Sequence, residues 1–249
     1  MRLVLWDVDG TLVHTAGHGR DAFGEAFRSV FGRDADLEAI RMGGRTDHWI
    51  AMAVLRNNGV ADGAPHLEQM FGELERALQG RRELIAAEGQ ALPGAHAVLR
   101  AIAREPDTTQ SLLTGNIEPN AAIKLSAFGL ERFVDLEIGG YGSDHGVRSE
   151  LVRVVHEKAA VRRGLFLTAR DTVVIGDTPH DVDAAKTAGA KAVGVATGEY
   201  GVDALRSSGA DVVLEDLADL DSVLAVALEG SASDGQDGAA ELGKPGVVD

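Results

Sequence analysis

Two aspartates follow the first apolar run of this chain, and this feature constrains the fold more than any other. Residues 3–6 are Leu-Val-Leu-Trp, which predicts a strand buried on both faces, as in a parallel sheet. Asp7 and Asp9 come next, and because side chains alternate along an extended chain, both carboxylates point to the same side. Neighbouring carboxylates repel each other and lose hydration on burial, so this pair indicates a bound cation or a reaction.

The segment has two other interpretations. An EF-hand calcium loop has Asp or Asn as a ligand at its fifth position and glycine at its sixth. This chain has Thr11 and Leu12 there, so the spacing excludes such a loop. A polar turn after a strand stays compatible with the segment taken alone, and the choice depends on the residues at the ends of the other strands.

Composition limits the class of protein and its partners. Of the 249 residues, 45% are hydrophobic and 25% charged, as in a packed globular protein. The net charge of −15 disfavours nucleic acid and an anionic membrane surface as partners. The absence of cysteine excludes disulfides, thiolate catalysis and cysteine zinc sites. Since neither a signal peptide nor a membrane-length apolar run occurs, we expect a cytoplasmic protein. For its oligomeric state we expect a monomer or a homodimer.

The apolar pattern divides the chain into two parts and a tail. Residues 14–85 show helical periodicity and no convincing strand, which we interpret as one inserted helical cap domain. Residues 1–13 and 86–229 alternate predicted strands and helices, which favours an α/β core with a parallel sheet covered on both faces. One of these predicted strands spans residues 136–138. Residues 230–249 are rich in Gly, Ser, Ala and Asp, which predicts a disordered tail.

Short polar segments come after three of the predicted strands. They are residues 7–11, 114–116 and 176–181. Ligands of an open α/β sheet bind outside the carboxyl ends of its strands, so we expect all three segments at one site. The second segment alone is compatible with an ordinary turn, and the aspartates of the third with a helix cap. Together, the three segments supply four carboxylates and a threonine hydroxyl.

These segments resemble, in their residues and their order, the motifs of the haloacid dehalogenase superfamily of phosphohydrolases. The matching stretches are Asp7-Val8-Asp9-Gly10-Thr11, Thr114-Gly115-Asn116 and Gly176-Asp177-Thr178-Pro179-His180-Asp181. The first and third are specific to the family, whereas the second is not. The helical insertion is similar to the cap of the phosphoglycolate phosphatase and β-phosphoglucomutase branch. The resemblance covers roughly residues 1–228, and it implies a Rossmann-like core and a phosphatase of a small phosphorylated metabolite such as phosphoglycolate.

The resemblance also implies a role for each carboxylate. Asp7 would attack phosphorus and form an aspartyl-phosphate. Asp9 would protonate the leaving oxygen and then activate the hydrolytic water. Mg²⁺ would be held by the Asp7 carboxylate, the Asp9 backbone carbonyl and Asp177. Asp181 would support the metal or its waters.

Substrate binding is assigned on the same basis to one motif and one loop. Thr114 would hydrogen-bond a phosphate oxygen, helped by backbone amides near Gly10 and Gly115, with Asn116 beside Gly115. Arg45 lies in a loop at the place where related caps touch substrate, so it could bind a carboxylate or a second phosphate. A solvated arginine beside a helix cap is equally compatible with the sequence.

One position departs from the family pattern. The family places a lysine ahead of the helix before its last motif, but residues 142–149 contain no lysine. Arg148 is the permanent cation of this stretch, and we assign to it the binding of Asp7 and the phosphate. The equivalence is open, because arginine presents a planar fork where lysine presents a point charge. Lys124 is the rival, although the helical pattern predicts that it lies on a solvated helix side, away from the strand ends.

Three alternatives to a phosphatase stay open at this stage. A 2-haloacid dehalogenase uses its first aspartate on carbon and needs neither a metal nor a second acid, so Asp9 and Asp177 argue against it. A phosphomutase needs a phosphoenzyme that survives water. A non-catalytic regulator that keeps the fold usually loses catalytic carboxylates, and none is missing here.

Overall fold

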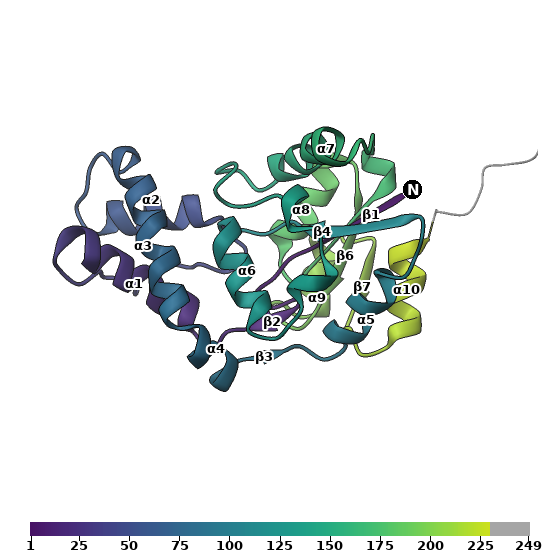
Figure 1. Cartoon of the computed structure of the whole chain (residues 1–249), viewed down its shortest axis with the longest axis horizontal. Helices are drawn as coiled ribbons and strands as arrows, with labels where there is room; N and C mark the ends of the chain where they lie inside the picture. Colours follow the sequence, from purple (N-terminus) through teal and green to yellow (C-terminus); the bar gives the residue numbers. More distant parts are fainter. Residues whose placement is uncertain (230–249) are drawn as a thin grey trace, which may run out of the picture.

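A computed structural model describes residues 1–229 of the chain, and the predicted tail at 230–249 lies outside the described residues. Figure 1 shows an α/β core on one side and a group of helices on the other. No helix within the described part has both the length and the apolarity that a membrane span requires.

A five-stranded parallel sheet forms the centre of the core, in the order β4-β1-β5-β6-β7. The strands are β1 Arg2–Trp6, β4 Thr108–Leu112, β5 Thr172–Gly176, β6 Lys191–Val195 and β7 Val212–Leu214. Strand β1 is buried along its whole length, as expected for a strand covered on both faces. The predicted α/β, Rossmann-like fold class is confirmed.

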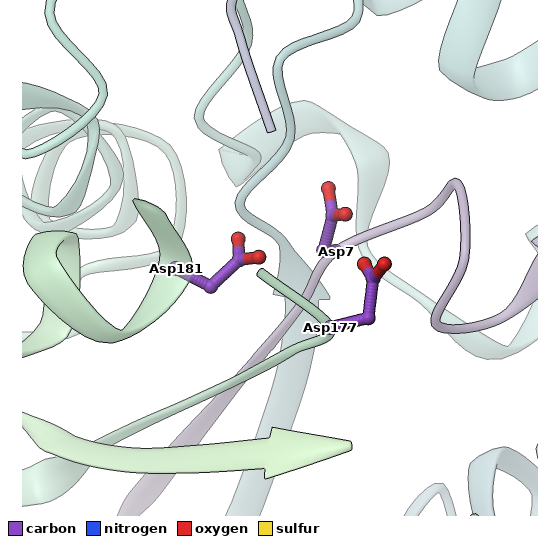
Figure 2. Close-up of side chains that lie close together, drawn as sticks. All are labelled: Asp7, Asp177 and Asp181. Atoms are coloured by element: carbon purple, nitrogen blue, oxygen red, sulfur yellow. The ribbon is translucent and has the colours of Figure 1, made fainter. Parts of the chain in front are cut away.

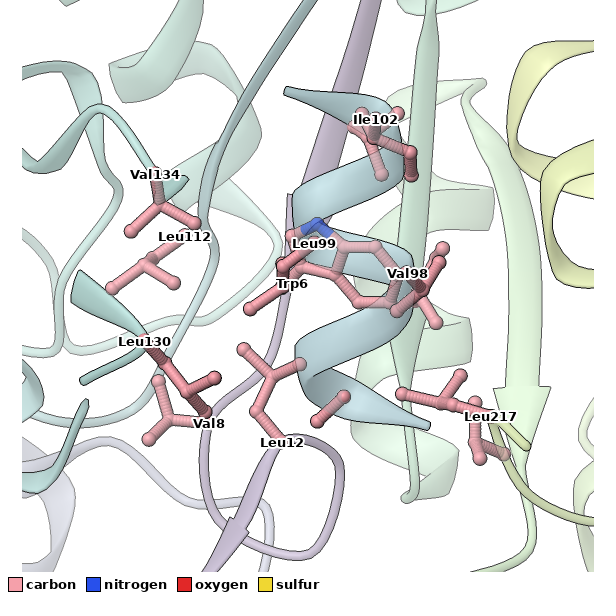
Figure 3. Close-up of a cluster of buried hydrophobic side chains, with 14 of the residues drawn as sticks. Trp6, Val8, Leu12, Val98, Leu99, Ile102, Leu112, Leu130, Val134 and Leu217 are labelled. Carbon is pink, nitrogen blue, oxygen red and sulfur yellow. The ribbon is translucent and has the colours of Figure 1, made fainter. Parts of the chain in front are cut away.

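Helices cover both faces of this sheet. Side chains of β1 alternate between the two faces of the sheet. On one face, Trp6 and Val98 belong to the same buried apolar cluster (Figure 3), and on the other face Leu5 and Val155 belong to a second cluster. The covering helices are α5 Ala95–Ile102, α6 Glu118–Ser126 and α10 Leu220–Leu228 on the first face, and α7 Glu150–Arg163, α8 Pro179–Ala188 and α9 Val202–Ser207 on the second.

The remaining helices pack around an apolar cluster of their own. They are α1 His18–Phe31, α2 Asp47–Asn57, α3 Leu67–Gly80 and α4 Arg82–Glu88, with a 3₁₀ turn at Ala64–His66. Phe27, Leu55 and Leu74 are fully or almost fully buried in this cluster. Helix α6 of the core packs against α3 and adds Ile123 to the same cluster, so it lies between the two parts of the molecule.

Three details differ from the sequence-based expectations. Residues Val13–His14 and Gln90–Ala91 pair as a short antiparallel ribbon, β2 and β3, where the chain enters and leaves the helical unit. Helix α4 continues across the boundary predicted at residue 85. Leu136–Ile138 forms a 3₁₀ turn and no strand, because Asp135 accepts a hydrogen bond from the Glu137 amide and closes the turn. Further 3₁₀ turns lie at Glu131–Phe133 and Ala169–Asp171.

Candidate active site

The three polar segments meet at the carboxyl end of the sheet. Trp6 is in register with Leu112 of β4 and Ile175 of β5, so the residues that come after these three strands are brought together. A cavity of about 790 Å³ opens there. Its wall includes residues of all three segments and of the loop before α2, among them Asp7, Asp9, Thr114, Asp177, Gly44 and Arg45.

Asp7, Asp177 and Asp181 form a buried cluster of carboxylates (Figure 2). Each offers an oxygen atom, and these atoms all lie within 4.8 Å of one another. Burial, followed by repulsion from the neighbouring carboxylates, raises the pKa of both Asp7 and Asp177 above the ordinary value, although Arg148 opposes this effect. Closely spaced, poorly neutralised carboxylates are the ligands that a hard divalent cation prefers, so the chemistry of this cluster fits such a cation.

The first motif shapes the space for Asp177. A Cβ atom at Gly10 or at Gly198 would overlap Asp177 Oδ2, so a side chain at either position would displace this carboxylate. Gly10 also has a φ of +81°, which side chains of other residues rarely adopt. Thr11 Oγ1 donates a hydrogen bond of 3.2 Å to Asp177 Oδ1, so strands β1 and β5 together fix this carboxylate.

Arg148 lies against this cluster. Its Nη2 donates to Asp7 Oδ1 at 2.7 Å and lies 2.5 Å from Asp181 Oδ1. Burial acts to lower the pKa of Arg148, but the charges of Asp181 and Asp7 outweigh it and raise the pKa, so the guanidinium stays charged. Its Nη1 donates to the Gly44 carbonyl at 3.3 Å. The residue assigned in place of the family lysine therefore contacts Asp7 and also the loop before α2.

The predicted position of Lys124 is wrong. Lys124 is buried on α6, and its Nζ donates to Asp9 Oδ2 and Asn116 Oδ1, at 2.6 Å each. Helix α6 starts just after the second motif. Asn120 and Lys124, four residues apart, share the side of α6 that faces the cavity, and Asn116 lines the same cavity just before the helix. Helical periodicity identifies which residues share a face, but the direction of that face depends on packing against α3.

Lys124 controls the charge of Asp9. Burial acts to raise the pKa of Asp9, but the Lys124 ammonium and hydrogen bonds from Lys124 and Asn116 outweigh it and lower the pKa. Asp9 is thus a carboxylate, the form that accepts a proton from water. Before it donates a proton to a leaving group, its pKa must rise, and the negative charge of a bound phosphate acts in that direction.

The second motif places the Thr114 hydroxyl at the site with its hydrogen unused by any described residue. Thr114 is fully buried, and its Oγ1 accepts hydrogen bonds from the backbone amide and from Nδ2 of Asn116. The Thr114 hydroxyl donates to no residue of the described chain, so its hydrogen is free for a ligand oxygen. Gly115 lies so close to the Arg45 carbonyl that a Cβ atom would overlap it, which places the helical unit directly against this motif.

The loop before α2 rests on the mouth of the site. Thr46 caps α2 by accepting a hydrogen bond from the Trp49 amide, and its hydroxyl donates to the Gly146 carbonyl. Arg45 lines the cavity, and its guanidinium stacks on the Trp49 ring with 4.6 Å to the centroid. The structure therefore brings Arg45 to the rim of the site, although it does not join the carboxylate cluster.

Sequence reasoning missed Asp47. This residue is buried at the start of α2, and its carboxylate accepts a hydrogen bond from the Ile117 amide. Burial raises the pKa of Asp47 to about 7, against the opposing effects of Lys124 and that hydrogen bond. No motif indicates it, because its environment exists only when the helical unit packs on the start of α6.

Comparison with known proteins agrees with this geometry. A family model described as haloacid dehalogenase-like hydrolase matches residues 4–186. A protein of Dickeya dadantii named "Probable phosphatase IndB" is 27% identical over 227 residues, which cover 88% of this chain and 91% of that protein. A phosphoglycolate phosphatase of Pseudomonas fluorescens is 26% identical over 88% of this chain and 78% of its own length.

Solved structures share the fold. CbbY from Rhodobacter sphaeroides, determined in complex with phosphate, superposes with a TM-score of 0.65 at 22% identity. The match covers 88% of this chain and 96% of that protein. At this level of identity the likeness concerns the fold alone.

Proposed function

This chain belongs to the haloacid dehalogenase-like hydrolase family, in its phosphatase branch, and we propose that it is a Mg²⁺-dependent phosphatase acting through an aspartyl-phosphate. The observation that carries the proposal is the charge of the buried cluster. Asp7, Asp177 and Asp181 are three carboxylates, and Arg148 is one guanidinium that contacts two of them. When all are ionised, two negative charges stay uncompensated, which matches the charge of one divalent cation.

The proposed reaction has two steps. Asp7 attacks phosphorus, and the bond from phosphorus to the leaving oxygen breaks while Asp9 gives that oxygen a proton. Asp9, now a carboxylate, then takes a proton from water, and the water attacks the aspartyl-phosphate to release phosphate and restore Asp7. Arg148 and Thr114 hold the phosphate oxygens. Mg²⁺ bound by Asp7, the Asp9 carbonyl and Asp177 would neutralise the charge between nucleophile and phosphate.

We propose a small phosphorylated metabolite as the substrate. Phosphoglycolate is the first candidate to test, because a relative that carries this name aligns over most of the chain. The cavity of about 790 Å³ also admits larger esters. Arg45 at the rim would bind an anionic group of the substrate. Action in the cytoplasm as a monomer or homodimer, without nucleic acid or membrane as partner, stays a prediction from the sequence.

Turnover of p-nitrophenyl phosphate with and without metal tests the proposal. We expect chelator-treated protein to regain about a hundredfold or more in rate when Mg²⁺ is added, because the metal relieves repulsion between Asp7 and the phosphate. The matched control is Asp177→Asn, which keeps the size of the side chain and should lose this response while remaining folded by circular dichroism. Phosphate release that is insensitive to chelation would contradict the metal assignment. Halide release from a 2-haloacid, with no phosphatase activity, would favour the dehalogenase.

Arg148→Ala should lower kcat/KM roughly ten- to a hundredfold. The substitution removes a charge-assisted contact worth on the order of 1.5–3 kcal/mol and leaves Asp7 and Asp181 without their shared cation. Arg148→Lys restores the charge and should recover part of the rate. The matched control is Arg163→Ala, since Arg163 pairs with Asp135 and Glu137 on the surface. A fully active, folded Arg148→Ala would show that another group compensates the phosphate.

A further inference from the structure

The side chain of Asn120 has unused hydrogen-bonding capacity in the wall of the cavity. Asn120 is 3% exposed and lines the cavity. Its Oδ1 is buried and has no hydrogen-bond partner, and its amide nitrogen donates to no residue within 1–229. Unpaired buried amides are rare in folded proteins because they lose hydration without compensation. An amide of this kind at the edge of a cavity is a candidate for contact with a ligand.

The position of Asn120 relates it to the leaving group. Asn120 lies one helical turn before Lys124 on the same side of α6, and Asn116 comes just before this helix. Those two residues hold Asp9 Oδ2, and Asp9 is the residue proposed to protonate the leaving oxygen. Asn120 therefore lies on the leaving-group side of the site, whereas Arg148 contacts Asp7 and Asp181.

The cavity wall near α6 combines apolar and charged side chains. Helix α6 packs against α3, and the helical unit contributes the apolar residues Phe23, Ile40, Ile50, Leu74 and Leu78 to the wall, together with the charged residues Arg20, Arg41 and Arg45. In a ligand pocket, a few fixed polar groups decide the orientation and identity of the ligand. A purely hydrocarbon leaving group would leave the Asn120 amide unpaired.

We propose that Asn120 is a specificity-determining residue that hydrogen-bonds an oxygen substituent on the leaving group of the phosphate ester. This inference rests on the proposed phosphatase function and narrows its substrate class to esters whose carbon skeleton carries a hydroxyl or a carboxylate. The amide N–H groups donate to either kind of oxygen, and the amide carbonyl accepts only from a hydroxyl. The leaving groups of simple alkyl and aryl phosphates carry neither a hydroxyl nor a carboxylate that could pair with the Asn120 amide.

Asn120→Leu tests this inference, because leucine has nearly the same size and cannot hydrogen-bond. The variant is assayed on phosphoglycolate, which carries a carboxylate, on glycerol 3-phosphate, which carries hydroxyls, and on phenyl phosphate, which carries neither. We expect kcat/KM to fall roughly ten- to a hundredfold on the better of the two oxygen-bearing esters. The fall should appear mainly in KM, and the rate on phenyl phosphate should change by less than about twofold.

The matched control is Asn57→Leu. Asn57 is exposed on α2, where its Nδ2 donates to the Asp36 carbonyl, and this variant should keep the wild-type rates on all three esters. Binding is measured in parallel, as the rise in melting temperature that each ester produces in Asp7→Asn protein with and without Asn120→Leu. The rise with the preferred oxygen-bearing ester should disappear when Asn120 is replaced.

The outcomes separate the subsite from the proposed function. An equal loss on all three esters, or no loss on any, would overturn the role of Asn120, and so would the absence of binding by both oxygen-bearing esters. Binding that depends on Asn120 without any phosphate release would retain the subsite and contradict the phosphatase. Unchanged turnover of all three esters by Asn120→Leu would retain the phosphatase and contradict the subsite.

Discussion

Asp7→Asn should abolish phosphate release, with a loss of at least about 10⁴-fold in kcat/KM. An amide oxygen is a poor nucleophile, and its attack on phosphorus cannot give a stable acyl phosphate. The side chain keeps its size, and its remaining oxygen can still accept the hydrogen bond that Arg148 donates to Asp7 Oδ1. The measurement is the rate on p-nitrophenyl phosphate, together with the mass of quenched wild-type protein, which should carry one phosphoryl group on Asp7.

Stability provides the control for Asp7→Asn. Because burial raises the pKa of Asp7 to about 6 in the folded protein, ionisation of Asp7 weakens the fold. Stability is therefore lost as the pH rises from the ordinary carboxyl pKa near ~4 through this raised pKa. In the presence of chelator, the variant should therefore melt no lower than the wild type at neutral pH. Substantial phosphate release by this stable variant would exclude Asp7 as the nucleophile.

The sequence predicts the sheet and the carboxylate cluster for a simple physical reason. A strand buried on both faces has a recognisable apolar run, and the residues after parallel strands must share one edge of the sheet. Asp7 and Asp177 could therefore be placed together without knowledge of side-chain positions. The register of β1 with β5 then brings the two carboxylates close enough to share an ion.

The roles of Lys124, Asn120 and Asp47 could not be predicted in the same way. Each depends on how helices pack, because α6 lies between the sheet and the helical unit. A lysine on a helix is usually solvated, and only the three-dimensional structure shows that Asp9 and Asn116 surround this one. The strand predicted at Leu136–Ile138 failed for a related reason, since three apolar residues do not distinguish a strand from a turn.

Arg148 supplies a permanent cation beside Asp7, although the family pattern has a lysine. A lysine ammonium is a compact charge, whereas the guanidinium fork reaches several acceptors in fixed directions. One nitrogen of Arg148 contacts Asp7 and Asp181, and the other donates to the Gly44 carbonyl in the loop before α2. The same side chain thus compensates one of the three negative charges of the cluster and joins it to the helical unit, which a lysine could not do with equal geometry.

Asp9→Asn should lower the rate on an alkyl phosphate by roughly 10²–10⁴-fold, the usual contribution of a general acid or base. On p-nitrophenyl phosphate the loss in kcat/KM should be smaller, because nitrophenolate leaves without a proton, whereas kcat should still fall because Asp9 also activates the hydrolytic water. Mg²⁺ should still raise the melting temperature of the variant, since the ligand proposed at this position is the backbone carbonyl. An unchanged rate on the alkyl phosphate would exclude the acid–base role.

Lys124→Met tests whether Lys124 affects the reaction through Asp9. Because the Lys124 ammonium helps to hold the pKa of Asp9 low, its removal should raise that pKa and shift the pH–rate limb governed by the Asp9 carboxylate to higher pH. The variant should lose less activity than Asp9→Asn. In the double variant, the loss should equal that of Asp9→Asn alone, because Lys124 acts on the reaction through Asp9. Additive losses would show that Lys124 contacts the substrate independently, and an unshifted pH profile would show that its ion pair with Asp9 opens before the reaction.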